Sequence, residues 1–343
     1  MSARLGASAR RSQAAVLRQN PVVRRLDCVE GLLRRKRTKP QSQQIYQAAV
    51  DEFHLAYRLS SNSSAAEIDT TLDAELVRLY LSGESPGKGK VLYYAVRWHH
   101  CLPNAALPRA FASRQGHSKV QRSQLEEPEP WQTVVLAALA LLSDPSKKAT
   151  PAERVWVASA MLIGFDVYAR GGDMMNLRRC ELLPPSPVTK SWSLTMWPST
   201  ETEVSKTGSQ DDTKYLGATN ADRAWLAQLC RPLLSMSRRS PYLFPITQRR
   251  YLCLFHLAHS LANVPASHPH RLRHGGASAD ALAQCSDLCL MERGPWRSVR
   301  SIMRYRRPAR YLRQLALLTP RQVSLAADAP TTIISLVRHL ASA

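Results

Sequence analysis

The sequence His268-Pro269-His270-Arg271-Leu272-Arg273-His274, followed by Gly294-Pro295-Trp296 and then by Arg304-Tyr305-Arg306-Arg307, decides how this chain is interpreted. His270 and Arg273 are three residues apart, and Trp296 precedes Tyr305 by nine residues. Arginine side chains hold phosphate oxygens, and a phenol hydroxyl can attack phosphorus. The pattern therefore predicts a phosphodiester-cleaving site with a tyrosine nucleophile.

The charge balance of the chain points to a polyanionic partner. Of 343 residues, 47 are Lys or Arg and 26 are Asp or Glu, which gives a formal net charge of +21. Such a surface gathers nucleic acid through counterion release, whatever the base sequence. Ribosome association and binding to an anionic membrane surface are the alternatives that composition alone leaves open. Double-stranded DNA is the partner we expect.

Cysteine usage and hydropathy bound the cellular setting. The seven cysteines form no pair with two-residue spacing, so neither a disulfide framework nor a zinc ribbon is indicated. The longest apolar run, residues 134–142, is much shorter than the roughly 20 residues that cross a bilayer. No signal-peptide pattern opens the chain. We expect a soluble intracellular protein without membrane association, in the nucleus if the source is eukaryotic.

Composition shifts divide the chain into four parts. Residues 1–40 carry no acid before Asp27 and end in a basic cluster, Arg34-Arg35-Lys36-Arg37-Thr38-Lys39-Pro40. This part is expected to be a disordered arm that contacts DNA, acts as a nuclear localisation signal, or is only a solvated tail. An organelle transit peptide is a further alternative. A helical DNA-binding domain over 41–125, a catalytic domain over 126–320 and a helical tail over 321–343 follow.

Apolar spacing predicts short helices in the part from 41 to 125. A first helix begins near Gln41, and a second begins at an N-cap, Asp69, and ends at Ser82-Gly83. The glycines and proline of 86–90 predict a turn before a third helix from Val91. The prolines at 103 and 108, with the acids and prolines of 126–130, predict an exposed extended linker.

The second half is expected to be helical around one small sheet. Helices are predicted over 131–142 and 151–168, and most of the chain from there to about residue 318 reads as helix. Residues 191–196 instead alternate with a period of two, so they predict a strand that pairs with part of 203–216. The predicted fold class is mainly α with a small antiparallel β-sheet.

Four motifs together resemble the tyrosine recombinase (lambda-integrase) family. Tyr168 to Arg178 is similar to the first arginine box, with Arg170 in the catalytic place and Asp173 where an acid is usual. Ser205-Lys206-Thr207-Gly208 resembles the hairpin lysine motif. The His270 to His274 box and the Trp296 to Tyr305 interval complete the order. The resemblance covers roughly residues 150–315 and implies a helical core-binding domain followed by a tyrosine recombinase catalytic domain.

The resemblance implies a role for each of six residues. Arg170 and Arg273 would hold the phosphate oxygens, where charge collects in the transition state. His270 would accept a proton or hydrogen-bond the phosphate, Trp296 would donate one hydrogen bond, and Tyr305 would form a 3′-phosphotyrosyl bond. Lys206 would protonate the leaving 5′-oxygen, with Lys190 and Lys214 as alternatives. No metal or other cofactor is expected.

Residues around these six are expected to support them. Asp173 and His274 are expected to be structural. Arginines close to the tyrosine would raise the positive potential and contact phosphates: Arg293, Arg297, Arg300, Arg304, Arg306 and Arg307. The first four recur at three or four residues, which predicts one helical face, and a solvated basic face is the alternative. Two departures from the family pattern, Gly275-Gly276 and Gly294-Pro295, put the helix geometry in question.

The resulting hypothesis is a site-specific DNA recombinase or integrase, encoded by a mobile element and acting as a homo-oligomer, a tetramer on DNA. A type IB topoisomerase shares the tyrosine and the phosphate clamp. A domesticated, inactive DNA-binding protein is the alternative outside enzymes. Residues 331–340 predict an amphipathic helix that packs either on a neighbouring copy or on its own domain. The DNA target and the outcome, whether integration, excision or inversion, are not encoded in any of these patterns.

Overall fold

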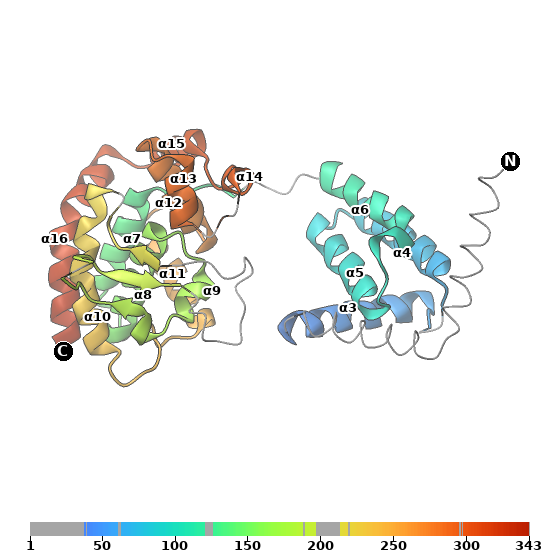
Figure 1. Ribbon diagram of the computed structural model, residues 1–343, viewed down its shortest axis with the longest axis horizontal. Coiled ribbons are helices and arrows are strands. Elements are labelled where there is room, and N and C mark those ends of the chain that lie inside the picture. The colour runs from blue at the N-terminus through green and yellow to red at the C-terminus, as the bar shows by residue number, and fades with distance from the viewer. Residues whose placement is uncertain are drawn as a thin grey trace. The chain divides into compact units, whose positions relative to one another are not determined.

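The chain forms a mainly helical structure with one three-stranded antiparallel sheet, which confirms the predicted fold class. The computed structural model describes residues 38, 40–60, 63–120, 126–187, 189–196, 213–218, 220–294, 296 and 298–342. The chain divides into two compact units, 1–125 and 126–343, drawn in Figure 1. Within the described ranges, no helix combines the length and the apolar character needed to cross a bilayer. The expected basic arm, residues 1–40, lies almost wholly outside those ranges.

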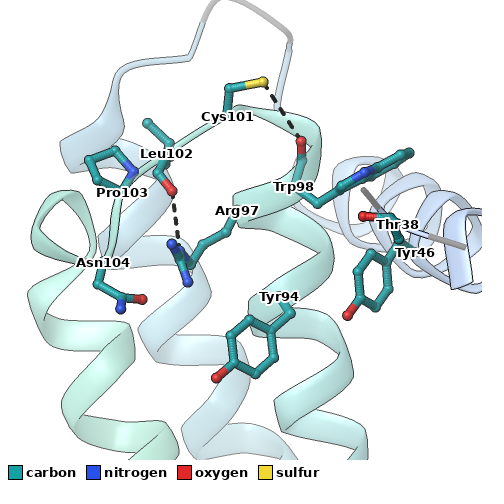
Figure 2. A pocket seen from close by; sticks show the side chains of 9 residues that line it. All are labelled: Thr38, Tyr46, Tyr94, Arg97, Trp98, Cys101, Leu102, Pro103 and Asn104. Atoms are coloured by element: carbon teal, nitrogen blue, oxygen red, sulfur yellow. Dashed lines mark hydrogen bonds between the residues drawn. The ribbon is translucent and has the colours of Figure 1, made fainter. Parts of the chain in front are cut away.

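The first unit is a small bundle of helices. Its elements are α3 (Pro40–Tyr57), α4 (Ala65–Leu81), α5 (Pro86–His99), the 3₁₀ helix η1 (Asn104–Ala106) and α6 (Pro108–Val120). Apolar side chains of all four α-helices form one core, which includes Phe53, Leu72, Tyr93 and Ala110. Figure 2 shows a cavity of about 490 Å³ near the end of α5, lined by the rings of Tyr46, Tyr94 and Trp98.

The start of α4 differs from the prediction. The helix begins at Ala65, because the Ser64 side chain accepts a hydrogen bond from the amide of Glu67. Asp69 therefore lies inside α4 and caps a different helix: its carboxylate accepts hydrogen bonds from the amides of Arg109 (3.1 Å) and Ala110 (3.0 Å) at the start of α6. An acid suits this place because helix N-termini leave amides unpaired.

Two proline signals were also misinterpreted. The predicted turn at 86–90 is wrong, because Pro86 occupies the first position of α5 and both glycines lie within the helix. Gly89 faces Leu76 of α4 at 3.0 Å from an ideal Cβ, so its small size permits close packing. Pro108 begins α6 and does not belong to an exposed linker.

The second unit contains most of the helices and the sheet. Its elements in chain order are α7 (Trp131–Leu142), α8 (Pro151–Asp166), α9 (Gly171–Met175), η2 (Arg179–Glu181), β1 (Leu182–Leu183), β2 (Ser193–Thr195), β3 (Thr213–Tyr215), η3 (Ala221–Leu229), α10 (Cys230–Met236), α11 (Gln248–Leu261), α12 (His270–Leu282), α13 (Asp287–Arg293), α14 (Val299–Ile302), α15 (Pro308–Leu315) and α16 (Pro320–Ser342). The nearly continuous apolar sequences of α7 and α8 place them in the middle of the core.

The sheet has the order β1-β2-β3, with both pairs antiparallel. Trp192, Leu194 and Met196 are buried, as the period of two predicts, and Leu194 pairs with Leu182 on one side and Lys214 on the other. The two-residue strand β1 was not predicted, since its sequence is too short to show a period.

Two segments of the second unit pack more closely than expected. The part from 321 to 343 was predicted as a separate tail. Its residues 321–342 form most of α16, which lies against α7 and buries Ile333 and Val337 (Figure 1). The helix therefore packs on its own unit. The predicted exposed linker at 126–130 is extended but only partly exposed, because Glu129 is buried and hydrogen-bonds to His259 and Ser267.

Candidate active site

Helix α12 carries the most unusual side chain of the second unit. Arg273 is fully buried, and its Nη1 donates a hydrogen bond of 2.8 Å to the carbonyl oxygen of Tyr168. Its guanidinium carbon lies 4.8 Å from the ring centre of Trp296 and 4.9 Å from that of Tyr305. Nε and Nη2 of Arg273 have no hydrogen-bond partner among the described residues. A buried cation with two unpaired donors beside a tyrosine is suited to receive an anion.

The electrostatic surroundings of Arg273 favour an anionic ligand. Burial, together with the positive charge of Arg170, lowers the pKa of Arg273 to about 10, so the group stays charged at neutral pH. Trp296 adds a third unpaired donor, since its buried Nε1 also lacks a partner among the described residues. The unpaired donors of Arg273 therefore lie near the positive charge of Arg170 and the negative charge of Asp173.

The Tyr168 carbonyl is aimed by an uncommon backbone conformation. Tyr168 follows α8 with a φ of 52°, the left-handed region that bulky residues rarely adopt. Its buried hydroxyl donates to the carboxylate of Asp280, and its ring lies 5.6 Å from Trp296. These contacts hold the turn whose carbonyl oxygen fixes Arg273.

Tyr305 is held between aromatic rings and by its own backbone. Its ring stacks on His274 with centroids 4.7 Å apart, and it lies 4.9 Å from Trp296 and 5.9 Å from His270. The buried Ser278 hydroxyl donates to the Tyr305 carbonyl oxygen (3.1 Å) and accepts from the amide of Arg307 (2.9 Å). Tyr305 itself is partly exposed.

Both histidines of α12 are favoured in the neutral form. Burial, followed by the charge of Arg273, lowers the pKa of His270. Burial also lowers the pKa of His274, to about 3, and nearby His270 and Arg307 add to this effect. His270 is half-buried and His274 is buried. His270 is therefore the more accessible of the two histidines, and His274 packs against the Tyr305 ring.

Arg170 and Asp173 lie at the start of the short helix α9. The Asp173 carboxylate accepts a hydrogen bond from the Arg170 amide (3.3 Å) and forms an ion pair with its guanidinium (3.5 Å). Burial raises the pKa of Asp173, although the Arg170 charge opposes that shift. Gly171 packs against Pro269, with an ideal Cβ 3.0 Å from Pro269 Cβ, which brings Arg170 beside His270. Asp173 caps the helix and orients the arginine.

The glycines that depart from the family pattern permit close packing. A Cβ on Gly275 would overlap the Glu129 carbonyl oxygen, and one on Gly276 would overlap the Phe165 carbonyl oxygen. Helix α12 nevertheless runs unbroken through both positions. A Cβ on Gly294 would overlap the Trp296 ring, so glycine is also required there. The departures hold α12 close to α8 and seat Trp296.

A buried ionic cluster lies behind Tyr168. It contains two acids, Asp166 and Asp280, and two arginines, Arg223 and Arg293. Arg293 bonds to Asp166 at 2.8 Å, and Arg223 bonds to Asp280. The cluster joins α8, α12 and α13 to η3, and the two acids balance the two arginines. The prediction that Arg293 contacts phosphate is therefore wrong, since its charge is buried and paired.

The other predicted DNA-contacting arginines differ from one another. Arg300 and Arg304 are exposed, and Arg297 lies outside the described residues. Arg306 pairs with Asp287 at 2.5 Å, and Arg307 donates to the carbonyl oxygen of Glu126 at 2.6 Å. The predicted single helical face from 293 to 304 is wrong, because α13 ends at Arg293 and the separate helix α14 spans only 299–302.

The lysine assignment rests on sequence. Lys206 falls between β2 and β3, outside the described residues. Of the alternatives, Lys190 is exposed in a turn, whereas Lys214 is buried on β3 and donates to the Glu292 carbonyl oxygen. That contact gives Lys214 a structural role in joining the sheet to α13.

Sequence reasoning missed the residues that support the site. Tyr168 was quoted within a motif without a role, and the other four residues were not selected: Asp166, Arg223, Ser278 and Asp280. The available signal was an acid within an apolar helix: Asp166 ends the apolar run of α8, and Asp280 lies among alanines and a leucine of α12. Acids in such places are seldom buried without a partner.

Comparisons with known proteins find a distant structural likeness to solved structures. No protein-family model matches the chain, and no curated protein matches it in sequence. One solved structure that is similar to it is a crystal structure of XerA recombinase, with a TM-score of 0.39 and 14% sequence identity. The match covers 84% of this chain and 99% of that one.

Proposed function

We propose that this protein is a tyrosine recombinase that cuts and rejoins double-stranded DNA. The observation that carries the proposal is the buried guanidinium of Arg273, which has two unpaired N–H donors next to the Tyr305 ring. A phosphodiester supplies the oxyanions that such donors require. Arg170 on the same side of the site and the chain's net charge of +21 support a DNA backbone as the source of that phosphate.

Each step of the proposed reaction has a group to perform it. Tyr305 Oη attacks phosphorus and forms a new P–O bond as the bond to the 5′-oxygen breaks. Neutral His270 accepts the phenol proton, and Arg170, Arg273 and Trp296 Nε1 stabilise the charge that develops on the non-bridging oxygens. Lys206 is proposed to give a proton to the leaving 5′-oxygen.

The products are a 3′-phosphotyrosyl bond and a free 5′-hydroxyl. Because the adduct retains the energy of the phosphodiester, attack by a 5′-hydroxyl reseals DNA and restores Tyr305 without ATP. If that hydroxyl comes from a second duplex, strands are exchanged. We propose a site-specific recombinase or integrase of a mobile element, which acts on DNA as an assembly of several copies.

A trapping experiment tests the proposal. Nicked duplexes from the genomic DNA on either side of the gene release the 5′-hydroxyl fragment after cutting, so a covalent adduct accumulates and is seen on a denaturing gel. Tyr305→Phe should abolish the adduct while duplex binding stays within a few-fold of wild type. Tyr242→Phe, at an exposed tyrosine of the same unit, should keep both properties.

Three outcomes would replace this proposal. An adduct that persists in Tyr305→Phe would show that the nucleophile is wrong. Tyr311, the next tyrosine, is poorly placed to act, because it is buried and its hydroxyl accepts a hydrogen bond from the Trp131 amide (2.9 Å). Steady relaxation of supercoiled plasmids without a specific site would indicate a type IB topoisomerase. Duplex binding with no adduct on any substrate would indicate an inactive DNA-binding protein.

A further inference from the structure

Three histidine side chains meet in the first unit, which takes no part in the proposed cleavage chemistry. His54 lies on α3, His99 is the last residue of α5, and His100 caps that helix. One ring nitrogen from each lies within 4.8 Å of the other two. The Nε2 atoms of His54 and His100 are 2.9 Å apart. Among the described residues, this is the one group of three or more His, Cys, Asp or Glu side chains with such spacing.

The spacing of these nitrogens suits a metal ion. With Zn–N bonds of about 2.0–2.1 Å, tetrahedral geometry puts two ligand nitrogens roughly 3.3 Å apart. The observed separations extend from 2.9 Å to no more than 4.8 Å, so small changes in side-chain torsion reach that value. A hydrogen bond between His54 and His100 explains the approach of two rings. The ring centre of His99 lies 5.2 Å from that of His54 and 4.9 Å from that of His100.

The backbone around these histidines favours binding. The end of α5 is fixed by hydrogen bonds from the His100 amide to Val96 O (3.0 Å) and from Arg97 Nε to Leu102 O (3.2 Å). Figure 2 draws the second of these bonds. The two ligands on α5 are therefore held on a rigid turn.

We propose that His54, His99 and His100 bind one divalent transition-metal ion of the zinc class. Three imidazole nitrogens suit Zn²⁺, Co²⁺, Ni²⁺ or Cu²⁺ and do not suit Mg²⁺ or Ca²⁺, which require oxygen ligands. Three protein ligands leave a fourth tetrahedral position for water or an external group. The ion links α3 to the end of α5, so binding stabilises the first unit.

The test uses the full-length protein after removal of metal with a chelator. We expect calorimetric titration with Zn²⁺ to show one tight site in wild type. His54→Gln and the double variant His99→Gln/His100→Gln should each weaken it more than about 100-fold, since loss of a group that only orients a ligand already costs about 10- to 100-fold. His256→Gln, at an exposed histidine of the second unit, should leave the site unchanged.

Two further measurements separate ligand loss from misfolding. Co²⁺ bound to wild type should give the visible absorption of nitrogen ligands without a thiolate charge-transfer band. Zn²⁺ should raise the Tm of wild type and not that of His54→Gln, with circular dichroism checking that each variant folds. Zn²⁺ affinity unchanged in both histidine variants, or a thiolate band in the Co²⁺ spectrum, would overturn the proposal. If a variant fails to fold, the wild-type Co²⁺ spectrum and Tm shift decide the question.

Discussion

Arg273 is fully buried, although two of its nitrogen atoms have no hydrogen-bond partner among the described residues. Leaving a buried donor unpaired costs about 1–3 kcal/mol for each group, and more for a charged one. A bound phosphate recovers this free energy, and the recovery is largest when negative charge on the phosphate is greatest. For that reason we expect Arg273 to stabilise the transition state more than the ground state.

Substitution of Arg273 tests this difference. Arg273→Lys keeps the charge but loses the planar fork, so we expect cleavage to slow by at least about 100-fold, the effect of removing one transition-state donor. Duplex affinity should change only a few-fold. Single-turnover cleavage rates and equilibrium binding measure the two quantities. Arg239→Lys, at an exposed arginine outside the predicted phosphate contacts, should change neither, and equal losses of rate and affinity for Arg273→Lys would contradict the role.

His270 predicts the pH dependence of cleavage. Its pKa is lowered from the usual value of 6.5, chiefly by burial and then by the charge of Arg273. A proton acceptor must be neutral, so the rate should be constant above the pKa and should fall as the pH drops through it. We therefore expect the acid limb of the pH–rate profile to have its midpoint below 6.5. His270→Gln should flatten that limb, and a midpoint above 6.5 in wild type would exclude His270 as the acceptor.

The reacting groups were more predictable from sequence than the groups that hold them. His270 and Arg273 share one helix, and Trp296 and Tyr305 are close in the chain, so spacing was informative. Tyr168 and Asp280 are 112 residues apart, and their hydrogen bond depends on how α8 and α12 pack. No local sequence pattern indicates a hydrogen bond between residues so far apart in the chain. The hydrogen bond from Ser278 to the Tyr305 carbonyl oxygen likewise depends on the segment at Tyr305 lying against α12.

At the scale of elements, α12 depends on glycine for its place beside α8. Gly276→Ala would drive a Cβ into the Phe165 carbonyl oxygen, a backbone atom that cannot swing aside. We expect a loss of about 1–3 kcal/mol in the free energy of unfolding, measured by urea denaturation. Gly164→Ala is the matched control, because its Cβ would meet Met174 at an ordinary 3.6 Å. If the two variants lose equal stability, the close approach of α12 is not what requires glycine.

The boundaries of elements show where local signals succeed. Helix α7 has the predicted bounds, 131–142, and α8 begins at Pro151 with a capping box between Thr150 and Glu153. Local sequence signals gave wrong element boundaries where a residue type is compatible with two different structures. Asp69 is a good cap, but it caps α6 from within α4, and Pro86 begins a helix although its glycine neighbours suggest a turn.

At the scale of the whole molecule, buried and exposed charged residues contribute differently to the net charge. The buried cluster of Asp166, Asp280, Arg223 and Arg293 contains two charges of each sign, so it contributes nothing to the net charge of +21. Exposed and N-terminal basic residues must account for the proposed attraction to DNA. The basic cluster Arg34-Arg35-Lys36-Arg37 is the densest of these.

Neutralising that cluster measures how much it contributes to duplex binding. Replacement of all four residues by glutamine should weaken duplex binding and reduce the slope of log K against log salt concentration by up to about 3.6, since each phosphate contact contributes about 0.9. The cleavage rate of bound substrate should remain unchanged, because the cluster is remote in sequence from the proposed site. An unchanged slope would show that the cluster does not contact the DNA backbone.

Ser278 ties the backbone of Tyr305 to α12, the helix that also carries Arg273. The proposed nucleophile and the proposed phosphate-binding arginine therefore belong to one chain. We expect each copy to cut a strand with its own side chains, without borrowing a tyrosine from its neighbour. Each subunit would then supply both the tyrosine and the arginine of its own site. Copies that cooperate on two duplexes would therefore have to regulate one another through the timing of cutting.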